Sequence, residues 1–522
     1  MTVWLLFGIA LAIIIVRPLI VYFYDPKCLR RYPNQNILSP FTNLAYVWER
    51  SDNFRTRRLY RQHQKYPIIR TGPATISFGS VEAINDIYGH GTPCLKYETY
   101  QMTAGSHSNI LNVIDRDEHS RKRRMLSNAF ATRNLEQWEF KISDKVERLL
   151  KQLDQRCTPV LSEVNPAAAQ GFNIEWRLWS NLFTIEAIAD IALSENLGML
   201  ESGCDTILVA NSEGSGARSL RFLQSLHGGA QISSRFVGAP DWFPFLKTAT
   251  KFLVPSIRRQ WEHGQSFGTI VSYLVGKRVR RGGSGGNLDD FLTCLIQDRL
   301  GKPRSLDRGE IEAEINILLD AGSDTTAIAL VHILYYLVRN PHVLIKLRSE
   351  VAEALDGELI APYAKVKSLP YLRACLEESL RLSPPLPRGL ERKTPPSGMK
   401  IMGVWVPGNV GVSVPAYVSH RDPALFPDPE KYVPERWLDG NVNISKMRAV
   451  FMPFSTGARA CIGRNITMME QQILVASLVY RYDFTLPSDD WQLEYEEAFN
   501  LWPASMPMKF WRRPEVPLGP KS

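Results

Sequence analysis

The most constraining feature of this chain is a short loop near its C-terminal end, Phe454 to Gly463, which reads F-S-T-G-A-R-A-C-I-G. Apolar residues at helical spacing follow its single cysteine, Cys461, which places this cysteine at or just before a helix N-terminus. Unpaired N–H groups and the positive end of the helix dipole lie there, and both favour a thiolate over a thiol. Gly457 permits a tight turn, Gly463 lets a bulky flat group approach the backbone, and Arg459 can bind a carboxylate through two nitrogens.

A lone cysteine is more often a small buried apolar side chain than a ligand. Here, however, Phe, Gly, Arg, Cys and Gly stand at fixed offsets in one string. A thiolate beside the apolar wall of Phe454 is typical of a haem-iron ligand loop. The string resembles the signature F-x-x-G-x-R-x-C-x-G of the cytochrome P-450 family. This resemblance implies that Cys461 binds the iron of haem b (iron protoporphyrin IX) as an axial thiolate, and that Phe454, Arg459 and Gly463 contact the cofactor.

Composition excludes several classes of protein. The chain has 522 residues, and its apolar fraction of 44% supports a large core. The formal charge is +9, but the basic residues are dispersed and no nucleic-acid motif occurs, so we expect no nucleic-acid partner. A basic patch for an acidic partner or a membrane, or an ordinary solvated surface, remains open. The seven cysteines are widely spaced without a C-x-x-C pair, which excludes a disulfide framework or a zinc module and suits a reducing compartment.

The N-terminus predicts a membrane anchor. Val3 to Val16 is almost continuously apolar and Leu19 to Tyr24 continues the run, to about the 20 residues that span a bilayer. No Lys or Arg precedes the run, whereas Lys27, Arg30 and Arg31 follow it. A cleaved signal peptide would show the opposite charge placement. We therefore expect an uncleaved single-pass anchor in the endoplasmic reticulum membrane, with the following domain in the cytosol.

The predicted fold is mainly α with small β-sheets. The family resemblance implies the cytochrome P-450 fold, a single large haem domain behind an N-terminal transmembrane helix. We divide the chain into an anchor (1–24), a proline-rich linker (25–45) and the haem-thiolate monooxygenase domain (46–522). The segment Pro67 to Phe78 reads as two short strands and Met399 to Ser413 as a hairpin.

The segment Asp115 to Phe130 predicts a charged helix. Asp115 is a candidate N-cap, with Glu118 as its capping-box partner. His119 and Arg123 are four residues apart and therefore lie on one face. A charge run of this kind is usually a solvated helix face. The family resemblance instead implies that His119 and Arg123 contact the haem propionates, and that the remaining basic residues of the helix face an electron donor.

A long apolar helix is predicted over Glu310 to Asn340, and its middle reads A-G-S-D-T-T. Gly322 weakens a helix, and a buried Asp or Thr needs partners there. The string could mark only a kinked helix, but an acid–alcohol pair can also relay protons. It resembles the family's oxygen-activation motif [AG]-G-x-[DE]-T-[TS]. The resemblance implies that Thr325 orders hydrogen bonds at the oxygen, that Asp324 passes protons inward, and that Gly322 leaves room for O2.

A structural motif precedes the ligand loop. Glu378 and Arg381 lie three apart on a predicted helix, which alone would be an ordinary surface pair. They resemble the family's E-x-x-R, whose third member would be Arg436 in P-E-R-W. A carboxylate between two guanidinium groups can lock the chain behind the ligand loop. Arg392 matches the position of another propionate-binding arginine in the family.

The predicted function is a membrane-anchored haem-thiolate monooxygenase that inserts one atom of O2 into a hydrophobic small molecule. The chain shows no dinucleotide fingerprint, so electrons are expected from a separate NADPH–cytochrome P-450 reductase, with cytochrome b5 as a second donor. Two alternatives remain: a haem-thiolate isomerase or dehydratase, and a non-catalytic membrane-anchored haem-binding protein. The Asp324–Thr325 pair argues against the isomerase.

A finer resemblance concerns the substrate. The strings L-K-Y-E-T-Y (Leu95 to Tyr100) and R-D-E-H-S-R-K-R (Arg116 to Arg123) look like those of the fungal benzoate para-hydroxylase branch and related secondary-metabolite oxygenases. The C-terminal tail differs from that branch, so benzoate itself is not predicted. By the same resemblance, residues 95–111, 218–245, 327–331 and 499–502 line the substrate pocket.

Overall fold

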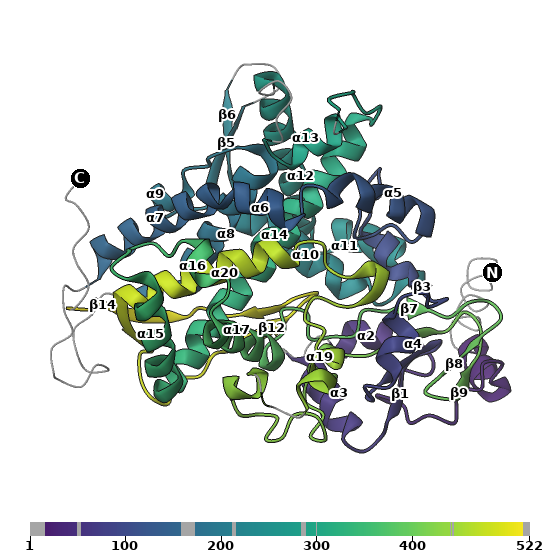
Figure 1. The fold of residues 1–522 in the computed structure, drawn as a ribbon. Helices are drawn as coiled ribbons and strands as arrows, with labels where there is room; N and C mark the ends of the chain where they lie inside the picture. Colours follow the sequence, from purple (N-terminus) through teal and green to yellow (C-terminus); the bar gives the residue numbers. More distant parts are fainter. Residues whose placement is uncertain are drawn as a thin grey trace.

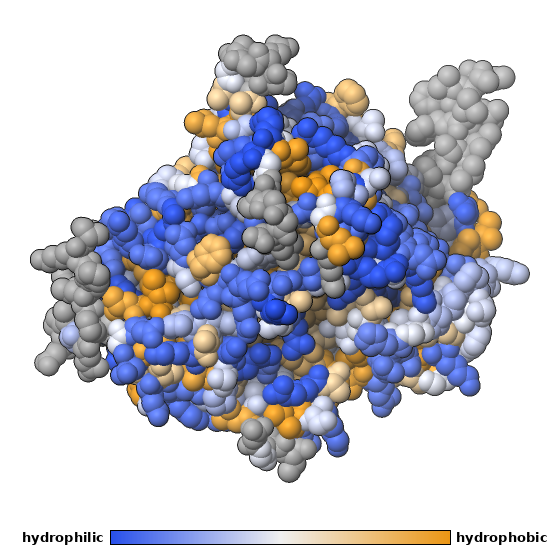
Figure 2. Space-filling view, turned by 45° about the horizontal axis from the view of Figure 1, so that its top comes forward, coloured by the Kyte–Doolittle hydropathy of each residue, from blue (hydrophilic) through white to orange (hydrophobic). Residues whose placement is uncertain are grey.

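The computed structural model describes residues 16–49, 54–157, 173–210, 216–282, 289–298, 300–438, 440 and 443–514. It confirms a mainly helical fold with small sheets. Helices α7, α8, α14 and α20 gather in one part of the molecule, and the strands near the N-terminus form the other part (Figure 1). Polar and charged side chains cover most of the face drawn in Figure 2, and apolar residues form small separate groups on it.

The helices of the first half are α2 (Leu44–Glu49), α3 (Arg55–His63), α4 (Ala83–Tyr88), η1 (Glu98–Thr103), α5 (Arg116–Ser127), α6 (Thr132–Gln137), α7 (Glu139–Arg156), α8 (Trp176–Leu193), α9 (Met199–Ser202), α10 (Phe222–Phe236), η2 (Pro240–Trp242), α11 (Phe243–Leu253) and α12 (Pro255–Arg281). Those of the second half are α13 (Phe291–Ile296), α14 (Arg308–Arg339), α15 (Pro341–Leu355), α16 (Tyr363–Val366), α17 (Pro370–Leu382), α18 (Ala416–Ser419), η3 (Pro434–Trp437), α19 (Ile444–Val450), η4 (Gly457–Arg459) and α20 (Arg464–Arg481).

The largest sheet has the order β1-β2-β10-β7-β3. Its strands are β1 (Ile68–Gly72), β2 (Thr75–Phe78), β10 (Gly411–Ser413), β7 (Arg392–Lys393) and β3 (Leu95–Lys96). A second sheet joins β11 (Tyr482–Thr485), β14 (Pro507–Arg512) and β4 (Asn173–Glu175). The described residues also form three two-stranded ribbons. They pair β5 (Thr206–Ala210) with β6 (Ala217–Arg221), β8 (Met399–Ile401) with β9 (Val404–Val406), and β12 (Tyr495–Glu497) with β13 (Leu501–Pro503).

The predicted hairpin over residues 399–413 is shorter in the structure. It consists of β8 and β9 alone, joined at Met402 and Gly403, which both have positive φ. The following strand, β10, pairs with β2 and β7 instead. The two strands predicted over residues 67–78 are confirmed as β1 and β2.

The central helix α14 organises the core. It begins after Asp307, whose carboxylate accepts the N–H of Glu310 at 3.0 Å. It packs along α8 on one side and contacts α12, α17 and α20 on others. Within the described residues, α14 is the one helix long and apolar enough to span a membrane, but 78% of its apolar window is buried, as expected of a core helix.

The N-terminal segment packs closely on this domain. Residues 16–24 are helical, and the rest of the predicted anchor lies outside the described residues. In the predicted linker, Leu29 is fully buried and the Gln35 N–H donates to the Arg70 carbonyl at 2.8 Å. Gly238, after α10, is needed for this packing, because a Cβ there would lie 2.1 Å from Cδ1 of Tyr46.

The motif around Glu378 is assembled as the sequence predicts. Arg381 donates to both Glu378 oxygens at 2.8 and 2.9 Å, and Arg436 Nε donates to Oε1 at 3.0 Å. Two further donors were not predicted: the indole N–H of Trp437 at 2.9 Å and the backbone N–H of Val433 at 3.0 Å. The carboxylate is fully buried, and its five donors join α17 to η3 and the chain that leads to the ligand loop.

We predict that Glu378→Gln lowers the free energy of unfolding by about 3–5 kcal/mol, because it leaves two buried guanidinium groups without their counter-charge. Denaturant unfolding of the purified protein measures this change. Glu353→Gln is the matched control, since Glu353 is exposed on α15 and its substitution should change stability by less than about 0.5 kcal/mol. Equal effects of the two substitutions would contradict a structural role for this carboxylate.

Candidate active site

The ligand loop has the backbone that the sequence predicts. The Cys461 N–H donates to the Phe454 carbonyl at 2.8 Å, and α20 begins three residues after the cysteine. Gly457 has φ +71°, and a Cβ there would lie 1.9 Å from the Tyr88 carbonyl oxygen. Only glycine therefore fits at the turn that brings the loop against α4.

The Cys461 thiol experiences opposing influences. Cys461 is an exposed residue, yet the protein packed around its thiol raises the pKa of that thiol. The N–H groups of Gly463 and Arg464 and the charge of Arg123 act in the opposite direction. The expectation that the loop alone favours a thiolate is therefore corrected: burial outweighs the backbone dipoles, and a cation at the sulfur is needed to hold it ionised.

The space beside the sulfur is open. A Cβ on Gly463 would come no closer than 3.8 Å to the Cys461 sulfur and 3.9 Å to the Phe130 ring. Phe454 is partly buried against the main core, with the Arg464 guanidinium 5.9 Å from its ring centroid. The glycine thus leaves free room next to the cysteine and an aromatic wall nearby.

Two basic residues are paired on neighbouring strands of the large sheet. Lys96 of β3 lies directly opposite Arg392 of β7, and both are buried. Like charges at directly paired positions destabilise a sheet. Burial, followed by the charges of Arg459, Arg392 and Arg123, holds the pKa of Lys96 well below its usual range. Lys96 lies in the string L-K-Y-E-T-Y, but no local sequence signal marks it as part of this cluster.

The predicted propionate ligands join the same cluster. Burial and then the charges of Arg459 and Lys96 lower the pKa of His119 to about 3. Burial and then Arg392 and Arg116 lower the pKa of Arg459 to about 10. Arg459 also donates to the carbonyls of Val113 and Ile114 at 2.9 and 2.7 Å, which ties the ligand loop to the start of α5.

Arg123 connects α5 to the ligand loop by donating to the Ala460 carbonyl at 2.7 Å. With Arg123, the structure brings together all four basic residues predicted from sequence and adds Lys96. The neighbouring basic side chains lower the pKa of Lys96, His119 and Arg459, which shows that the cluster lacks negative charge. A group with two carboxylates next to Cys461 would neutralise them, so the donor set fits the propionates of a haem whose iron meets the sulfur.

The basic residues of α5 are only partly as predicted. Asp115 caps the helix by accepting the Glu118 N–H at 2.8 Å, but the Glu118 carboxylate pairs with Arg121 and does not complete a capping box. Lys122 is buried and pairs with Glu310 and Glu314 at the start of α14. The expectation that these basic residues face an electron donor is therefore wrong for Lys122, because α5 packs against acidic residues of α14.

One face of α14 borders a hollow. Ala321 is exposed and Thr325 is half-buried, whereas Ser323, Asp324 and Thr326 on the same stretch of the helix are buried. The Thr325 hydroxyl donates to the Ala321 carbonyl at 2.9 Å, which is the local bonding expected of a helical threonine. Thr326, the next residue, bonds to Thr467 of α20 at 3.0 Å, and so joins α14 to the helix that follows Cys461.

Asp324 points into a fixed network. Its Oδ1 accepts from His227 Nε2 at 2.9 Å and from Arg177 at 3.3 Å, and its Oδ2 accepts from Asn500 at 2.7 Å and Trp502 at 2.5 Å. Burial alone would raise the pKa of Asp324, but His227, Arg177 and Trp502 together lower it. The structure therefore places an ionised Asp324 beside Thr325. Sequence reasoning missed these four partners, because they come from α8, α10 and the C-terminal ribbon.

Gly322 has a packing role that the sequence did not predict. A Cβ at this position would lie 2.6 Å from Cγ1 of Ile188 on α8. The glycine thus permits the close contact of α8 and α14. Its role in making room for oxygen stays a prediction.

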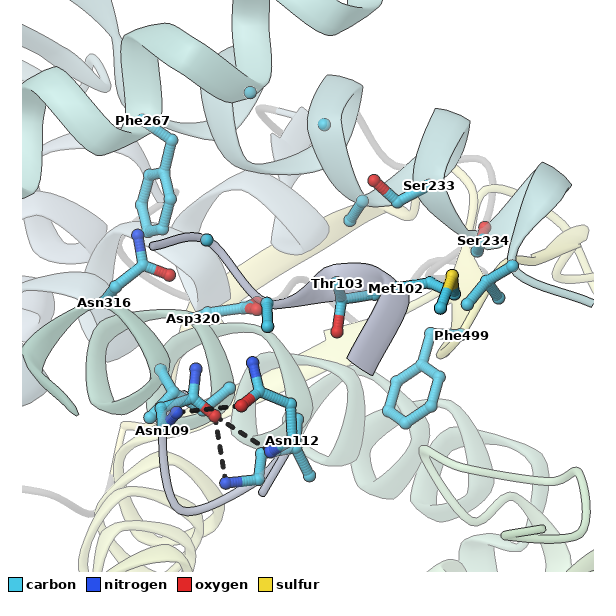
Figure 3. Close-up of a pocket in the computed structure, with 18 of the residues that line it drawn as sticks. Met102, Thr103, Asn109, Asn112, Ser233, Ser234, Phe267, Asn316, Asp320 and Phe499 are labelled. Carbon is cyan, nitrogen blue, oxygen red and sulfur yellow. Dashed lines mark hydrogen bonds between the residues drawn. The ribbon is translucent and has the colours of Figure 1, made fainter. Parts of the chain in front are cut away.

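A cavity of about 600 Å³ lies along α14 next to Asp324. It is enclosed by η1, α10, α11, α12 and the ribbon β12–β13 (Figure 3). Met102, Phe267 and Phe499 form apolar parts of its wall, and Asn316 and Asp320 of α14 form a polar part. Parts of the predicted segments 95–111, 218–245 and 499–502 line it, whereas no residue of 327–331 does. Its size suits a small organic molecule.

Comparison with known proteins agrees with this geometry. The family model described as cytochrome P450 matches residues 57–509. The chain belongs to the cytochrome P450 family. It is a P450 monooxygenase. Benzoate 4-monooxygenase bphA from Aspergillus niger is 30% identical over 95% of this chain and 96% of its own length. Tryprostatin B 6-hydroxylase from Neosartorya fischeri is 28% identical over 90% of this chain and 80% of its own.

The fold agrees with that of a solved P450. The crystal structure of the cytochrome P450DA heme domain superimposes with a TM-score of 0.72, covering 92% of this chain and 98% of that one, at 18% sequence identity. Membership of the P450 family implies a haem-thiolate centre, a reductase as electron donor and a small-molecule substrate.

We predict that Lys96→Met weakens haem retention by about tenfold to a hundredfold, since a charge-assisted hydrogen bond contributes about 1.5–3 kcal/mol. Transfer of haem to an excess of apomyoglobin measures the rate of loss. Lys393→Met is the control, because Lys393 neighbours Arg392 on the same strand but pairs with Glu98. Equal rates of haem loss in the two variants would contradict the assignment of Lys96 to the propionate site.

Proposed function

We propose that this monooxygenase is anchored in the endoplasmic reticulum membrane and inserts one atom of O2 into a hydrophobic small molecule of fungal secondary metabolism. The observation that carries the catalytic part of this proposal is the open space at the Cys461 sulfur beside a cluster of five basic side chains that form no ion pair within the described residues. The haem they would hold supplies the activation of dioxygen, which no amino-acid side chain provides.

The residues of the chain have separate tasks in this proposal. Cys461 would bind the iron through its sulfur and supply electron density to it. Lys96, Arg392 and Arg459 would hold the propionates. On α14, the Thr325 hydroxyl donates to the Ala321 carbonyl and can accept a hydrogen bond from a group in the hollow. The ionised Asp324 beside it would orient the water or hydroxyl that delivers the proton.

The shape of the cavity supports a hydrophobic substrate. Aromatic and thioether side chains, among them Met102, Phe267 and Phe499, form apolar parts of its wall, and polar residues of α10, α14 and the segment after η1 lie between them (Figure 3). The relatives are named for the oxidation of benzoate and of tryprostatin B, so we propose a hydroxylation of a molecule of this general kind.

Electrons would arrive on the side of the ligand loop. Exposed basic residues surround it on four helices: Arg124, Arg133, Lys446, Arg448 and Arg464. A basic surface of this kind attracts an acidic partner and accelerates its association. We propose that the NADPH-dependent reductase docks there, with cytochrome b5 as an alternative donor.

Exposed apolar side chains support the membrane anchor. Ile20, Phe23 and Tyr24 are exposed at the end of the predicted span, and Phe252 and Leu253 are exposed on α11. The chain after the span packs against this region, since Asn43 donates to Asp241 at 3.3 Å just before α11. A helix in the bilayer and an apolar patch at its surface would hold the domain on the cytosolic side.

Turnover under 18O2 tests the catalytic proposal. Membranes that contain this protein and a P450 reductase are incubated with NADPH and with extracts of candidate metabolites. We expect products that are 16 mass units heavier than their substrates with 16O2 and 18 units heavier with 18O2, because one atom enters and the other leaves as water.

The control is Cys461→Ala in the same membranes, which should give none of these products. Label taken from H218O, or product formed without NADPH, would contradict a monooxygenase and support the isomerase or dehydratase alternative. Deletion of residues 1–24 should release the protein from carbonate-washed membranes, and its full retention there would contradict the anchor.

A further inference from the structure

We propose that Asp320 of α14 is a substrate-binding residue that selects substrates with a basic nitrogen, which it holds as a cation in the cavity. The inference rests on the proposed function, because it identifies the substrate class of the same cavity. It depends on two features of the cavity: the direction of the Asp320 side chain and its lack of a partner within the described residues.

Asp320 points into the cavity from the central helix. Figure 3 shows its carboxylate between η1, where Met102 and Thr103 lie, and α12, which carries Phe267. Asn316 lies one helical turn earlier and faces the same space. This stretch of α14 therefore contributes one carboxylate and one amide to the cavity wall, while other elements add the polar and basic residues Ser233, Ser234, Lys247, Lys251 and Arg388.

The other carboxylates of the cavity wall already have partners. Glu312 accepts from Arg308 at 2.6 Å and from Ser272 at 2.9 Å. Asp324 has its four donors, and Glu391 accepts from Thr99 at 3.2 Å. Within the described part of the chain, no donor or cation lies within bonding distance of the Asp320 carboxylate. A carboxylate without a partner in an enclosed cavity is costly unless a ligand supplies one.

A cationic ligand would stabilise this group. Burial and then the negative charge of Asp324 raise the pKa of Asp320 to about 7. The carboxyl group is therefore partly protonated near neutral pH when the cavity holds no cation. A protonated amine restores the ionised form and gains an ion pair in a region from which a substrate expels water.

A matched pair of probes tests the inference. One is 4-phenylbutyltrimethylammonium, whose nitrogen has no lone pair and cannot ligate iron. The other is its uncharged isostere, in which a tert-butyl group replaces the trimethylammonium. Dissociation constants for the full-length haem-loaded protein are measured at pH 8 by calorimetry. We expect Asp320→Asn to weaken binding of the cation about tenfold, or about 1.4 kcal/mol, and to change binding of the isostere less than about twofold.

Glu312→Gln is the matched control, because Glu312 borders the same cavity on the same helix but already pairs with Arg308; its cation binding should match the wild type. The carbon monoxide spectrum of each variant reports whether it holds its haem. Equal effects of Asp320→Asn on both probes, or no effect on either, would overturn the inference. Because the measurement needs no turnover, it stands apart from the oxygen-labelling test of the proposed function.

Discussion

The structure depends on an accumulation of positive charge that the protein does not neutralise. Lys96 and Arg392 lie opposite each other on adjacent strands. Besides burial, Arg459, Arg392 and Arg123 lower the pKa of Lys96, and Arg459 and Lys96 lower that of His119. Such an arrangement destabilises the folded chain by itself, and it becomes favourable when a dianionic group binds. The haem is therefore expected to contribute to folding stability as well as to chemistry.

The rest of the fold keeps this region rigid around an open space. Glu378 holds the approach to the ligand loop through five donors, and Gly457 lets the loop lie against α4. On the opposite side, α14 is buried over most of its length but leaves Ala321 and Thr325 accessible. The basic cluster around Lys96 is held in place by this packing, and α14 leaves accessible positions beside it. A site built on such rigid elements can hold a flat cofactor and a substrate together.

The features that depend on residues close together in the sequence were predictable from short motifs, and those that depend on distant segments were not. The ligand loop, the α5 cap at Asp115 and the Glu378 motif depend on residues that are near one another in the sequence, so short motifs revealed them. Lys96 and the partners of Asp324 come from distant segments, and only the sheet register and the packing of α8 and α10 bring them together. The burial of Lys122 and the raised pKa of Cys461 were not predicted, because both depend on the density of surrounding protein.

The central claim is that Cys461 binds the haem iron through its sulfur. The most direct measurement is the Soret absorption of the purified, reduced protein under carbon monoxide, compared with that of Cys461→His. The account predicts the strongly red-shifted band of thiolate ligation for the wild type, and loss of that shift with retained haem for the variant. A wild-type spectrum without the red shift, or an unchanged band in Cys461→His, would contradict the account.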